Sequence, residues 1–484
     1  METATLVEKM QEILGPEGVI SEREQLRTYE CDGLMSYRVV PRIVVLPETA
    51  GQLQRIVQTC HDEGIPFVAR GSGTGLSGGA LPHEEGVLIA LARMREILEV
   101  DIPNQRVIVE PGVVNLWVTQ EVAPEGYYFA PDPSSQLVCS IGGTVAENSG
   151  GAHCLKYGFT TNHVTALEVV LPDGEVVHLG SKAPDTPGYD LVGAFVGSEG
   201  TLGIATKVTL RIVRQPETVK TLLAAFPSPD EAGAAVSEII AGGIIPSAAE
   251  IMDSLSIQAA EMAVHAGYPE GTGGILIVEL DGPQAEVDHQ FDEVVRICEE
   301  NHATEVRVAR DEEERVVLWK GRKAALAAMG RISHDCYLQD SVVPRTALSD
   351  VLKKIAALSD EWGLRVANFF HAGDGNLHPL VLYDERIEGE SEKAHELAGA
   401  IVLACLEYGG SITGEHGVGE DKKHYMPKMF TDDDMNTMQL LRCAFDPHGL
   451  ANPGKVFPTP RLCGEVPGPY KVHPLQKAGM AEMF

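Results

Sequence analysis

The chain has 484 residues, 44% hydrophobic and 22% charged, which is typical of a globular protein long enough for several domains. Seventy acidic against 38 basic residues give a formal net charge of −32, and because such a surface repels phosphate backbones we expect no nucleic-acid partner. No stretch approaches the roughly 20 apolar residues of a membrane span, and the nine cysteines form no C-x-x-C pair, which argues against an iron–sulfur cluster and for reduced thiols in the cytoplasm.

The first part of the chain alternates between helix and strand patterns. Apolar residues at helical spacing over positions 6–14 predict an amphipathic helix, which does not resemble a secretory signal. The next predicted elements are a helix at 49–63, strands at 65–69, 86–92 and 105–110, a hairpin of strands 164–171 and 175–179, and a strand at 204–213. A boundary is expected at Gln215-Pro216, where this pattern ends.

The second part mixes strands with long helices. Strands are predicted at 222–226, 275–280 and 305–308, and helices at 286–300, 312–329, 347–362 and 392–408. This pattern predicts an α+β domain with an antiparallel sheet. The tail after Pro458 has no clear periodicity and is expected to be loosely ordered.

Two histidines flank a predicted turn within residues 369–380. Asp374 and Gly375, between apolar runs, are the strongest short-range signal for a hairpin with a two-residue turn. The cross-strand pairs would be Gly373 with Asn376, Ala372 with Leu377, and His371 with His378. The imidazoles of His371 and His378 would then lie on one face, with Cβ atoms about 5 Å apart, where one divalent cation could bridge them. A bulge in the turn would instead send them to opposite faces.

A carboxylate and a third imidazole follow in the glycine-flanked segment 411–419, as Glu415 and His416. Two facing histidines and a carboxylate make a three-ligand site with an open coordination position, as catalytic metals require. The ordinary alternative is that each histidine is a buried or surface residue without a ligand, and that Asp-Gly is only a turn.

A dense glycine run, residues 70–80, follows the predicted strand 65–69. Glycines let backbone N–H groups approach a phosphate closely, so the run is expected to hold a pyrophosphate. Gly73, Gly75 and Gly78 have the spacing of the dinucleotide-binding fingerprint, but that motif must open a helix, and here Leu81-Pro82 leads into another strand. The alternative is a flexible glycine loop. Residues 131–135, 140–151, 156–158 and 197–204 supply further small residues that could wall a flat, diphosphate-bearing cofactor.

These motifs together make the chain similar to FAD-linked D-2-hydroxy acid dehydrogenases of the vanillyl-alcohol-oxidase-like (PCMH-type) flavoproteins. The resemblance rests on the glycine run, on Gly-Ser-Glu-Gly-Thr-Leu-Gly at 197–203, on His-Ala-Gly-Asp-Gly-Asn-Leu-His at 371–378 and on Gly-Glu-His-Gly-Val-Gly at 414–419. It extends from about Arg38 to Pro458. Within the family, the chain most resembles FAD-binding catalytic subunits of glycolate oxidase, and D-lactate dehydrogenases next.

The resemblance implies an α+β fold, with a PCMH-type FAD-binding domain of two α/β subdomains and a substrate-binding cap domain whose antiparallel sheet is covered by helices. The implied divisions are an N-terminal helical segment at 1–37, the FAD-binding domain at 38–216, the cap domain at 217–425, a C-terminal helix and loop returning to the flavin domain at 426–460, and a tail at 461–484.

The implied cofactor is FAD, bound non-covalently because residues 71–79 contain no histidine or cysteine for attachment, although His153-Cys154 lies nearby in sequence. The implied cofactor-binding residues are Arg70, Gly71, Ser72, Gly73, Thr74, Gly75, Ser77, Gly78, Pro131, Asp132, Gly142, Gly143, Thr144, Asn148, Gly150, Gly151, Tyr157, Gly158, Glu199, Gly200, Gly203, Ile204 and Asn452.

The resemblance also implies a divalent metal, zinc or else manganese or iron, bound by His371, His378 and Glu415. His416 is then the general base, and Arg322 binds the substrate carboxylate, whereas an arginine on a charged helix is most often only solvated. The expected reaction is oxidation of a small D-2-hydroxy acid, glycolate or D-lactate, to the 2-oxo acid, with hydride transfer to flavin N5.

Relatives that oxidise larger diacids place a lysine near Leu338 and an asparagine near Leu380, so their absence argues for a small or apolar substrate side group. The implied partners are a second flavin-type subunit and an iron–sulfur subunit, or a quinone or other electron acceptor, with peripheral membrane association through those subunits. Two alternatives remain: a non-redox enzyme like alkyl-dihydroxyacetone-phosphate synthase, and a flavin-free metal-dependent hydrolase.

Overall fold

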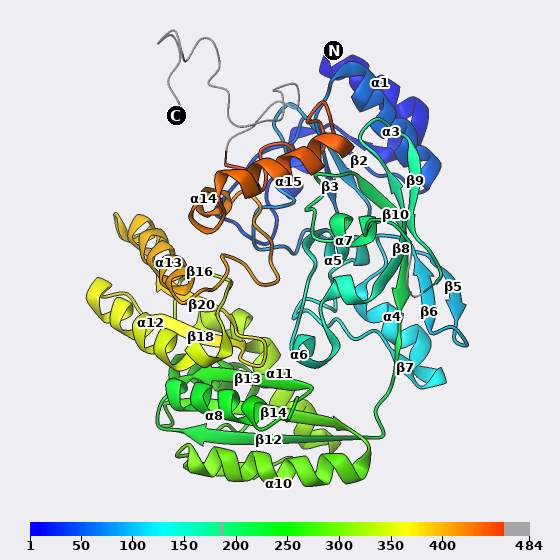
Figure 1. Cartoon of the computed structure of the whole chain (residues 1–484). Coiled ribbons are helices and arrows are strands. Elements are labelled where there is room, and N and C mark those ends of the chain that lie inside the picture. The colour runs from blue at the N-terminus through cyan, green and yellow to red at the C-terminus, as the bar shows by residue number, and fades with distance from the viewer. Residues whose placement is uncertain (184–186, 459–484) are drawn as a thin grey trace.

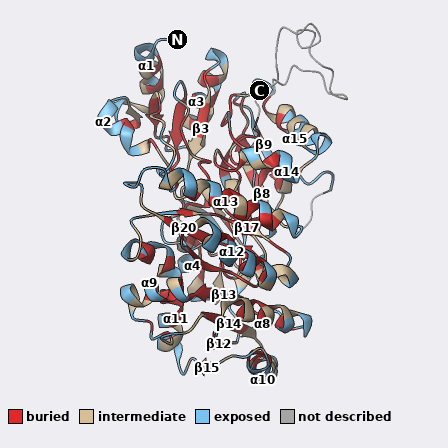
Figure 2. Cartoon of the chain, turned by 90° about the vertical axis from the view of Figure 1, so that its left-hand side faces the viewer, coloured by how far each residue is buried: buried red, intermediate tan, exposed pale blue. Residues whose placement is uncertain are grey.

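The structure is a computed structural model that describes residues 1–183 and 187–458; the tail at 461–484 lies outside the described residues. The described residues fold into three large sheets with their helices, together with a small two-stranded sheet (Figure 1). Buried residues concentrate in the strands and on the helix faces turned toward them, as Figure 2 shows. Among the described residues, no helix combines the length and apolarity required to cross a membrane.

The first sheet is four-stranded, in the order β1 (Val19–Ile20), β2 (Ile43–Val45), β4 (Val87–Ala90), β3 (Phe67–Arg70). Strands β2, β3 and β4 are parallel, and β1 joins antiparallel. Helices α1 (Thr3–Leu14) and α3 (Ala50–Glu63) contribute Leu6 and Leu53 to its core. Helix α3 begins at Thr49, which caps it through the N–H of Gln52, and ends at Gly64, whose φ is +64°. The predicted helix 49–63 is confirmed.

The second sheet is antiparallel and five-stranded, in the order β5 (Ile97–Asp101), β6 (Arg106–Val109), β10 (Ile204–Arg211), β8 (Val164–Val170), β9 (Val176–Gly180). The predicted hairpin is β8 and β9. Smaller elements complete this part: α2 (Arg23–Leu26), α4 (Asn115–Val122), β7 (Tyr127–Tyr128), α5 (Ile141–Glu147), α6 (Cys154–Tyr157), α7 (Leu191–Phe195) and β11 (Val213–Arg214).

The third sheet is antiparallel and nine-stranded. Its strands are β12 (Thr218–Phe226), β13 (Ala248–Asp253), β14 (Gly274–Gly282), β15 (Glu305–Val308), β16 (Asp335–Leu338), β17 (Ser341–Val342), β18 (Val366–His371), β19 (Asn376–Leu377) and β20 (Pro379–Tyr383). One face is covered by α8 (Pro229–Ala241), α10 (Gln284–Glu300), α12 (Leu348–Trp362) and α13 (Glu390–Glu407), and the other by α9 (Ser254–Val264) and α11 (Glu312–Ala328). Neighbouring residues in β18 point to opposite faces of the sheet. Phe370 packs in the core under α8, α10, α12 and α13, and Phe369 packs in the core under α9 and α11.

The predicted register of the histidine hairpin is wrong by two residues. His371 pairs with Asn376, not with His378, and the turn spans four residues, 372–375. A two-residue turn is not formed because backbone groups of the turn form hydrogen bonds with neighbouring segments. The N–H of Gly373 donates to the carbonyl of Ala249, and the carbonyl of Gly375 accepts from the N–H of Val343. Since side chains alternate with a period of two, an even shift keeps both histidines on one face of the sheet.

After the third sheet the chain returns to the first. Helices α14 (Met426–Met429) and α15 (Asp432–Phe445) lead to a parallel bridge between Ala451 and Phe67. The side-chain amide of Asn452 then donates to the carbonyls of Gly79 and Glu199, at 2.9 and 2.6 Å. The C-terminal segment thereby ties the glycine run to the segment after α7.

Candidate active site

A cavity of about 530 Å³ is lined on one side by residues of the first two sheets and their loops, and on the other by residues of the third sheet and its helices. Its walls combine the glycine run with segments from residues 133–149 and 195–205, and the opposite side is formed by α11, Leu338, Phe369, His378, Glu415 and His416. The glycine run and the histidine motifs, which lie hundreds of residues apart in the sequence, therefore line the same cavity.

Glycines shape the first side of this cavity. A Cβ at Gly75 or Gly200 would meet no atom closer than 3.8 Å, and one at Gly143 would meet only Ser140 Oγ at 3.4 Å. Because these positions face open space, added side chains would fill the cavity itself. Gly73 and Gly200 also have φ values of +68° and +70°, which favour glycine. The wall fits a flat cofactor that approaches the backbone closely.

About half of the expected cofactor-binding residues line the cavity: Gly71, Ser72, Gly73, Thr74, Gly75, Gly142, Gly143, Thr144, Glu199, Gly200, Gly203 and Ile204. The others do not: Arg70, Ser77, Gly78, Pro131, Asp132, Asn148, Gly150, Gly151, Tyr157, Gly158 and Asn452. The wall also contains residues of the predicted segments 131–135, 140–151 and 197–204 that were not among the individually expected cofactor-binding residues: Ser134, Ser135, Ser140, Glu147, Ser149 and Ser198. Most of these are hydroxyl residues beside the predicted glycines, and that proximity was the available signal.

Several residues away from the wall instead bind other parts of the chain. The guanidinium of Arg70 donates to the carbonyl of Cys31 at 2.7 Å. The hydroxyl of Tyr157 donates to Asp281 at 2.6 Å, which joins α6 to β14. Their placement indicates that they hold segments and domains together.

The predicted metal ligands come together in the structure. Oε1 of Glu415 lies 3.2 Å from Nε2 of His371 and 3.3 Å from Nε2 of His378, and the two rings are 5.2 Å apart at 82°. All three residues are buried. Burial disfavours the charge of Glu415, but His371 and His378 outweigh it and lower the pKa of the carboxyl to about 2.

Glu250 is a functional candidate that the sequence reasoning missed. It lies opposite His371 in the neighbouring strand β13, and its Oε1 is 2.7 Å from His371 Nδ1. Because a carboxylate accepts this bond, Nδ1 carries the hydrogen and Nε2 faces Glu415. Oε2 of Glu250 lies 2.7 Å from Nη2 of Arg322. The only sequence signal was a carboxylate within the apolar strand 248–252.

Arg322 is buried, not solvated, at 4% exposure on α11. Its guanidinium lies over the ring of Phe369, 5.3 Å from the centroid, and it lines the cavity. It is therefore placed where it can meet an anionic ligand in the cavity.

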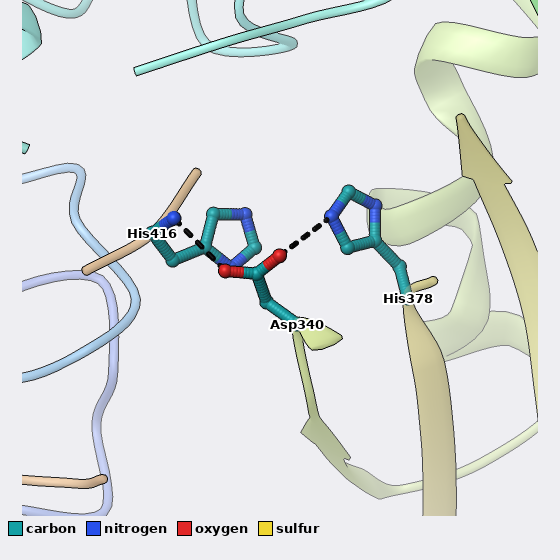
Figure 3. A group of neighbouring side chains, drawn as sticks. All are labelled: Asp340, His378 and His416. Atoms are coloured by element: carbon teal, nitrogen blue, oxygen red, sulfur yellow. Dashed lines mark hydrogen bonds and ion pairs between the residues drawn. The ribbon is translucent and has the colours of Figure 1, made fainter. Parts of the chain in front are cut away.

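A third carboxylate, Asp340, extends the histidine cluster beyond Glu415 and Glu250 (Figure 3). Its Oδ1 lies 3.5 Å from Nε2 of His378, and the ring of His416 stacks on that of His378 at 5.0 Å and 8°. Asp340, His378 and His416 form a second group whose ligand atoms lie within 4.8 Å of one another. Burial lowers the pKa of His416 to about 4, so its imidazole is neutral at pH 7.

Three buried polar atoms in this cluster have no hydrogen-bond partner within residues 1–183 and 187–458: Oδ1 of Asp340, Nε2 of His378 and Oε2 of Glu415. Buried polar atoms in folded proteins are usually paired with protein groups, with water or with an ion. Imidazole nitrogens and carboxylate oxygens together suit zinc, manganese or iron. The residues therefore fit a divalent cation.

Residues 215–456 match the family described as FAD linked oxidases, C-terminal domain, and residues 41–180 match one described as FAD binding domain. The chain belongs to the FAD-linked oxidase family. It is an oxidoreductase with an FAD-binding domain, as the resemblance predicted.

Curated relatives cover nearly the whole chain. The glycolate oxidase subunit GlcD of Escherichia coli K12 is 50% identical over 471 residues, which are 97% of this chain and 94% of the relative. GlcD of Bacillus subtilis is 38% identical over 458 residues, 94% of this chain and 97% of the relative. The mitochondrial D-lactate dehydrogenase (cytochrome) of Arabidopsis thaliana is 31% identical over 427 residues, 88% of this chain and 74% of the relative.

Solved structures show the fold. p-Cresol methylhydroxylase (PCMH) with bound substrate has a TM-score of 0.79 at 17% identity, covering 94% of this chain and 96% of that chain. An alkyldihydroxyacetonephosphate synthase has a TM-score of 0.71 at 19% identity, covering 94% and 85%. The predicted α+β fold with a PCMH-type FAD-binding domain is confirmed.

Proposed function

We propose that this protein oxidises a small D-2-hydroxy acid, glycolate or D-lactate, to the 2-oxo acid with FAD as the electron acceptor. The observation that carries the proposal is that a cluster of three histidines and a carboxylate lines, or lies directly behind, the same cavity as the glycine walls. Relatives named as a glycolate oxidase subunit and as a D-lactate dehydrogenase, at 50% and 31% identity, support the substrate class.

Bound FAD would supply the electron acceptor, taking a hydride from Cα of the substrate. His371, His378 and Glu415 would hold a divalent cation, which would supply a Lewis acid that lowers the pKa of the substrate hydroxyl. We assign the cation as zinc, with manganese or iron as alternatives.

His416 would take the hydroxyl proton. Its imidazole is neutral at pH 7, lines the cavity and lies beside the ligand His378. Arg322 would bind the substrate carboxylate with a guanidinium that Glu250 and Phe369 already hold in place. The balanced outcome is a 2-oxo acid, reduced flavin and a proton on His416.

The apolar part of the wall near these groups favours a small substrate side chain. Leu338, Phe369 and Leu326 line the cavity on the side of the histidine cluster. Leu380 does not: it is fully buried in the core between β20 and the helices α9 and α11. Among the described lining residues, Arg322 would bind the first carboxylate and Lys323 already lies 3.5 Å from Asp132, so a second carboxylate on the substrate would have to compete with Asp132 for Lys323.

Electrons would leave through an external acceptor. Support for partner subunits comes from the relatives, whose names describe one subunit of an oxidase. We propose a second flavin-type subunit and an iron–sulfur subunit, or a quinone, as acceptors, with a cytoplasmic location and membrane contact only through partners.

The decisive experiment is anaerobic mixing of the FAD- and metal-loaded protein with glycolate, D-lactate and L-lactate while the flavin spectrum is recorded. Bleaching by glycolate or D-lactate but not by L-lactate is expected. A flavin that no 2-hydroxy acid bleaches would contradict the proposal and favour a non-redox reaction like that of the synthase. A colourless protein that does not take up FAD would favour a flavin-free hydrolase.

A further inference from the structure

One buried carboxylate holds the segment that carries Glu415 and His416. Oδ2 of Asp340 accepts the hydroxyl of Thr413 at 2.7 Å and three consecutive backbone N–H groups, from Gly414, Glu415 and His416, at 3.0, 3.1 and 3.0 Å. Hydrogen bonds to a charged acceptor are about twice as strong as neutral ones. Consecutive amides that converge on one oxygen fix the backbone of both residues at once.

The other oxygen of Asp340 meets the opposite side of the cluster. Oδ1 lies 3.5 Å from Nε2 of His378, and Figure 3 shows the carboxylate between His378 and His416. In the described part of the chain neither Oδ1 nor that nitrogen has a hydrogen-bond partner. The Asp340 carboxylate thus contacts both His378, the proposed ligand in the hairpin, and the segment that carries Glu415.

Lys422 balances the buried charge of Asp340. This lysine is 1% exposed, its ammonium donates to the carbonyl of Asp340 at 3.2 Å, and it lies 3.6 Å from Oδ2. A buried carboxylate without a counter-charge is strongly destabilising, and Lys422 offsets that cost.

The far end of the same segment is held from the other side of the cavity. Glu199, on the glycine-rich wall, accepts the N–H groups of Val418 and Gly419 at 2.7 and 2.6 Å. The segment is therefore held between two carboxylates. Of the two, Asp340 binds the backbone of Glu415 and His416, the proposed metal ligand and the proposed base.

We propose that Asp340 is a positioning residue that sets Glu415, His416 and His378 for metal binding and proton transfer. The inference rests on the proposed metal site. It predicts that a change at Asp340 alters metal binding without altering FAD binding, because Asp340 is absent from the cavity wall.

The test is Mn²⁺ titration of FAD-loaded, metal-stripped full-length protein, followed by the electron paramagnetic resonance of the free ion. Asp340→Asn keeps the shape but weakens all four bonds and turns an amide N–H toward His378, so Mn²⁺ affinity should fall about 10- to 100-fold. Flavin absorbance should not change. The matched control is Asp253→Asn, a buried carboxylate in the same sheet that accepts the N–H of Ser256 and two N–H groups of Asn368 but none of the segment.

Hydrogen exchange of the amides at 414–416 gives a second measurement that needs no metal. These amides should exchange faster in Asp340→Asn and at the wild-type rate in Asp253→Asn. Unchanged Mn²⁺ affinity together with unchanged exchange would overturn the proposal. If Asp340→Asn does not fold, Thr413→Val tests the proposal instead. It removes one hydrogen-bond donor to Oδ2 and keeps the ion pair between Asp340 and Lys422. Mn²⁺ binding should then weaken by about 2- to 5-fold.

A wild-type protein that binds no Mn²⁺ and no other divalent ion would contradict the proposed metal site. The exchange measurement would still decide whether Asp340 orders the segment. The two failures are therefore distinguishable.

Discussion

The two sides of the cavity present different kinds of chemical groups to a ligand. The side formed by the glycine run and α5 presents mainly backbone and hydroxyl groups, with two carboxyl side chains, Glu147 and Glu199, and with glycines that face open space. The opposite side presents buried charged side chains that already contact one another, with Glu250 between His371 and Arg322. The first can recognise the shape of a flat cofactor, and the second can exchange protons and hold a cation.

This difference predicts which substitutions each side tolerates. Added volume should harm the glycine side, where a Cβ enters the cavity, while changed charge should harm the other, where each ionised group has a specific partner. Variants that separate FAD binding, metal binding and turnover test the contrast.

The largest effect is expected for His416→Ala, which removes the proposed base without touching the glycine side. The rate of anaerobic flavin reduction should fall about 10²- to 10⁴-fold, because general base catalysis contributes that much. FAD content should not change. His61→Ala is the control, since His61 lies on α3 and contacts His448. Near-normal reduction by His416→Ala would refute the base assignment.

Glu250→Gln should weaken metal binding about 10- to 100-fold, because the charge that orients His371 through Nδ1 is lost. Mn²⁺ titration of the FAD-loaded variant measures it. Glu279→Gln is the matched control: Glu279 is also a buried carboxylate in the same sheet and meets a histidine, His153, at 3.5 Å, but lies outside the cluster. Equal metal affinity in the two variants would show that Glu250 has no role in metal binding.

Gly143→Val tests the glycine side. The added side chain would enter open space, so the protein should fold while its dissociation constant for FAD rises at least about 10-fold. Gly51→Val is matched, because Gly51 also lies in the first turn of a helix and a Cβ there meets no atom within 4 Å. Fluorescence quenching of added FAD measures both. Equal FAD affinity would exclude α5 from the cofactor site.

The elements that the sequence predicted are present because their signals are local, whereas α8, β13, α9 and α15 were not predicted. Helix α3 shows this: its apolar spacing, the Thr49 cap and the Gly64 end all lie within the segment itself. The hairpin register was wrong because its cause is not local. Ala249 and Val343, far away in sequence, take the backbone groups of the turn.

The same distinction explains the site. His371, His378 and Glu415 could be found because they stand in motifs, whereas Glu250 and Asp340 could not, because each is a single carboxylate in an apolar strand or at its end. Their importance arises only when strands pair and when the segment 413–416 folds onto Asp340. Similarly, Tyr157 lies in a small-residue motif but contacts Asp281 across domains.

The two sides are also joined by one histidine, His153, which lies outside the cavity wall. Its Nδ1 is 2.9 Å from Asp132 of the glycine side, its Nε2 is 3.5 Å from Glu279 of the third sheet, and its ring stacks on Trp319 at 6.0 Å. Burial opposes its charge, but Asp132 and Glu279 outweigh burial and raise the pKa of His153 to about 10.

The last prediction concerns stability, from His153→Gln. A histidine whose pKa is raised by folding contributes stability that is complete below its unfolded value of about 6.5 and is lost as pH rises through about 10. Because the side chain is 23% exposed, we expect a difference between wild type and variant of about 2 kcal/mol at pH 6. Urea unfolding of the FAD-loaded proteins between pH 6 and 10 measures it. A difference that does not shrink with rising pH would mean that the link between the two sides does not depend on the charge of His153.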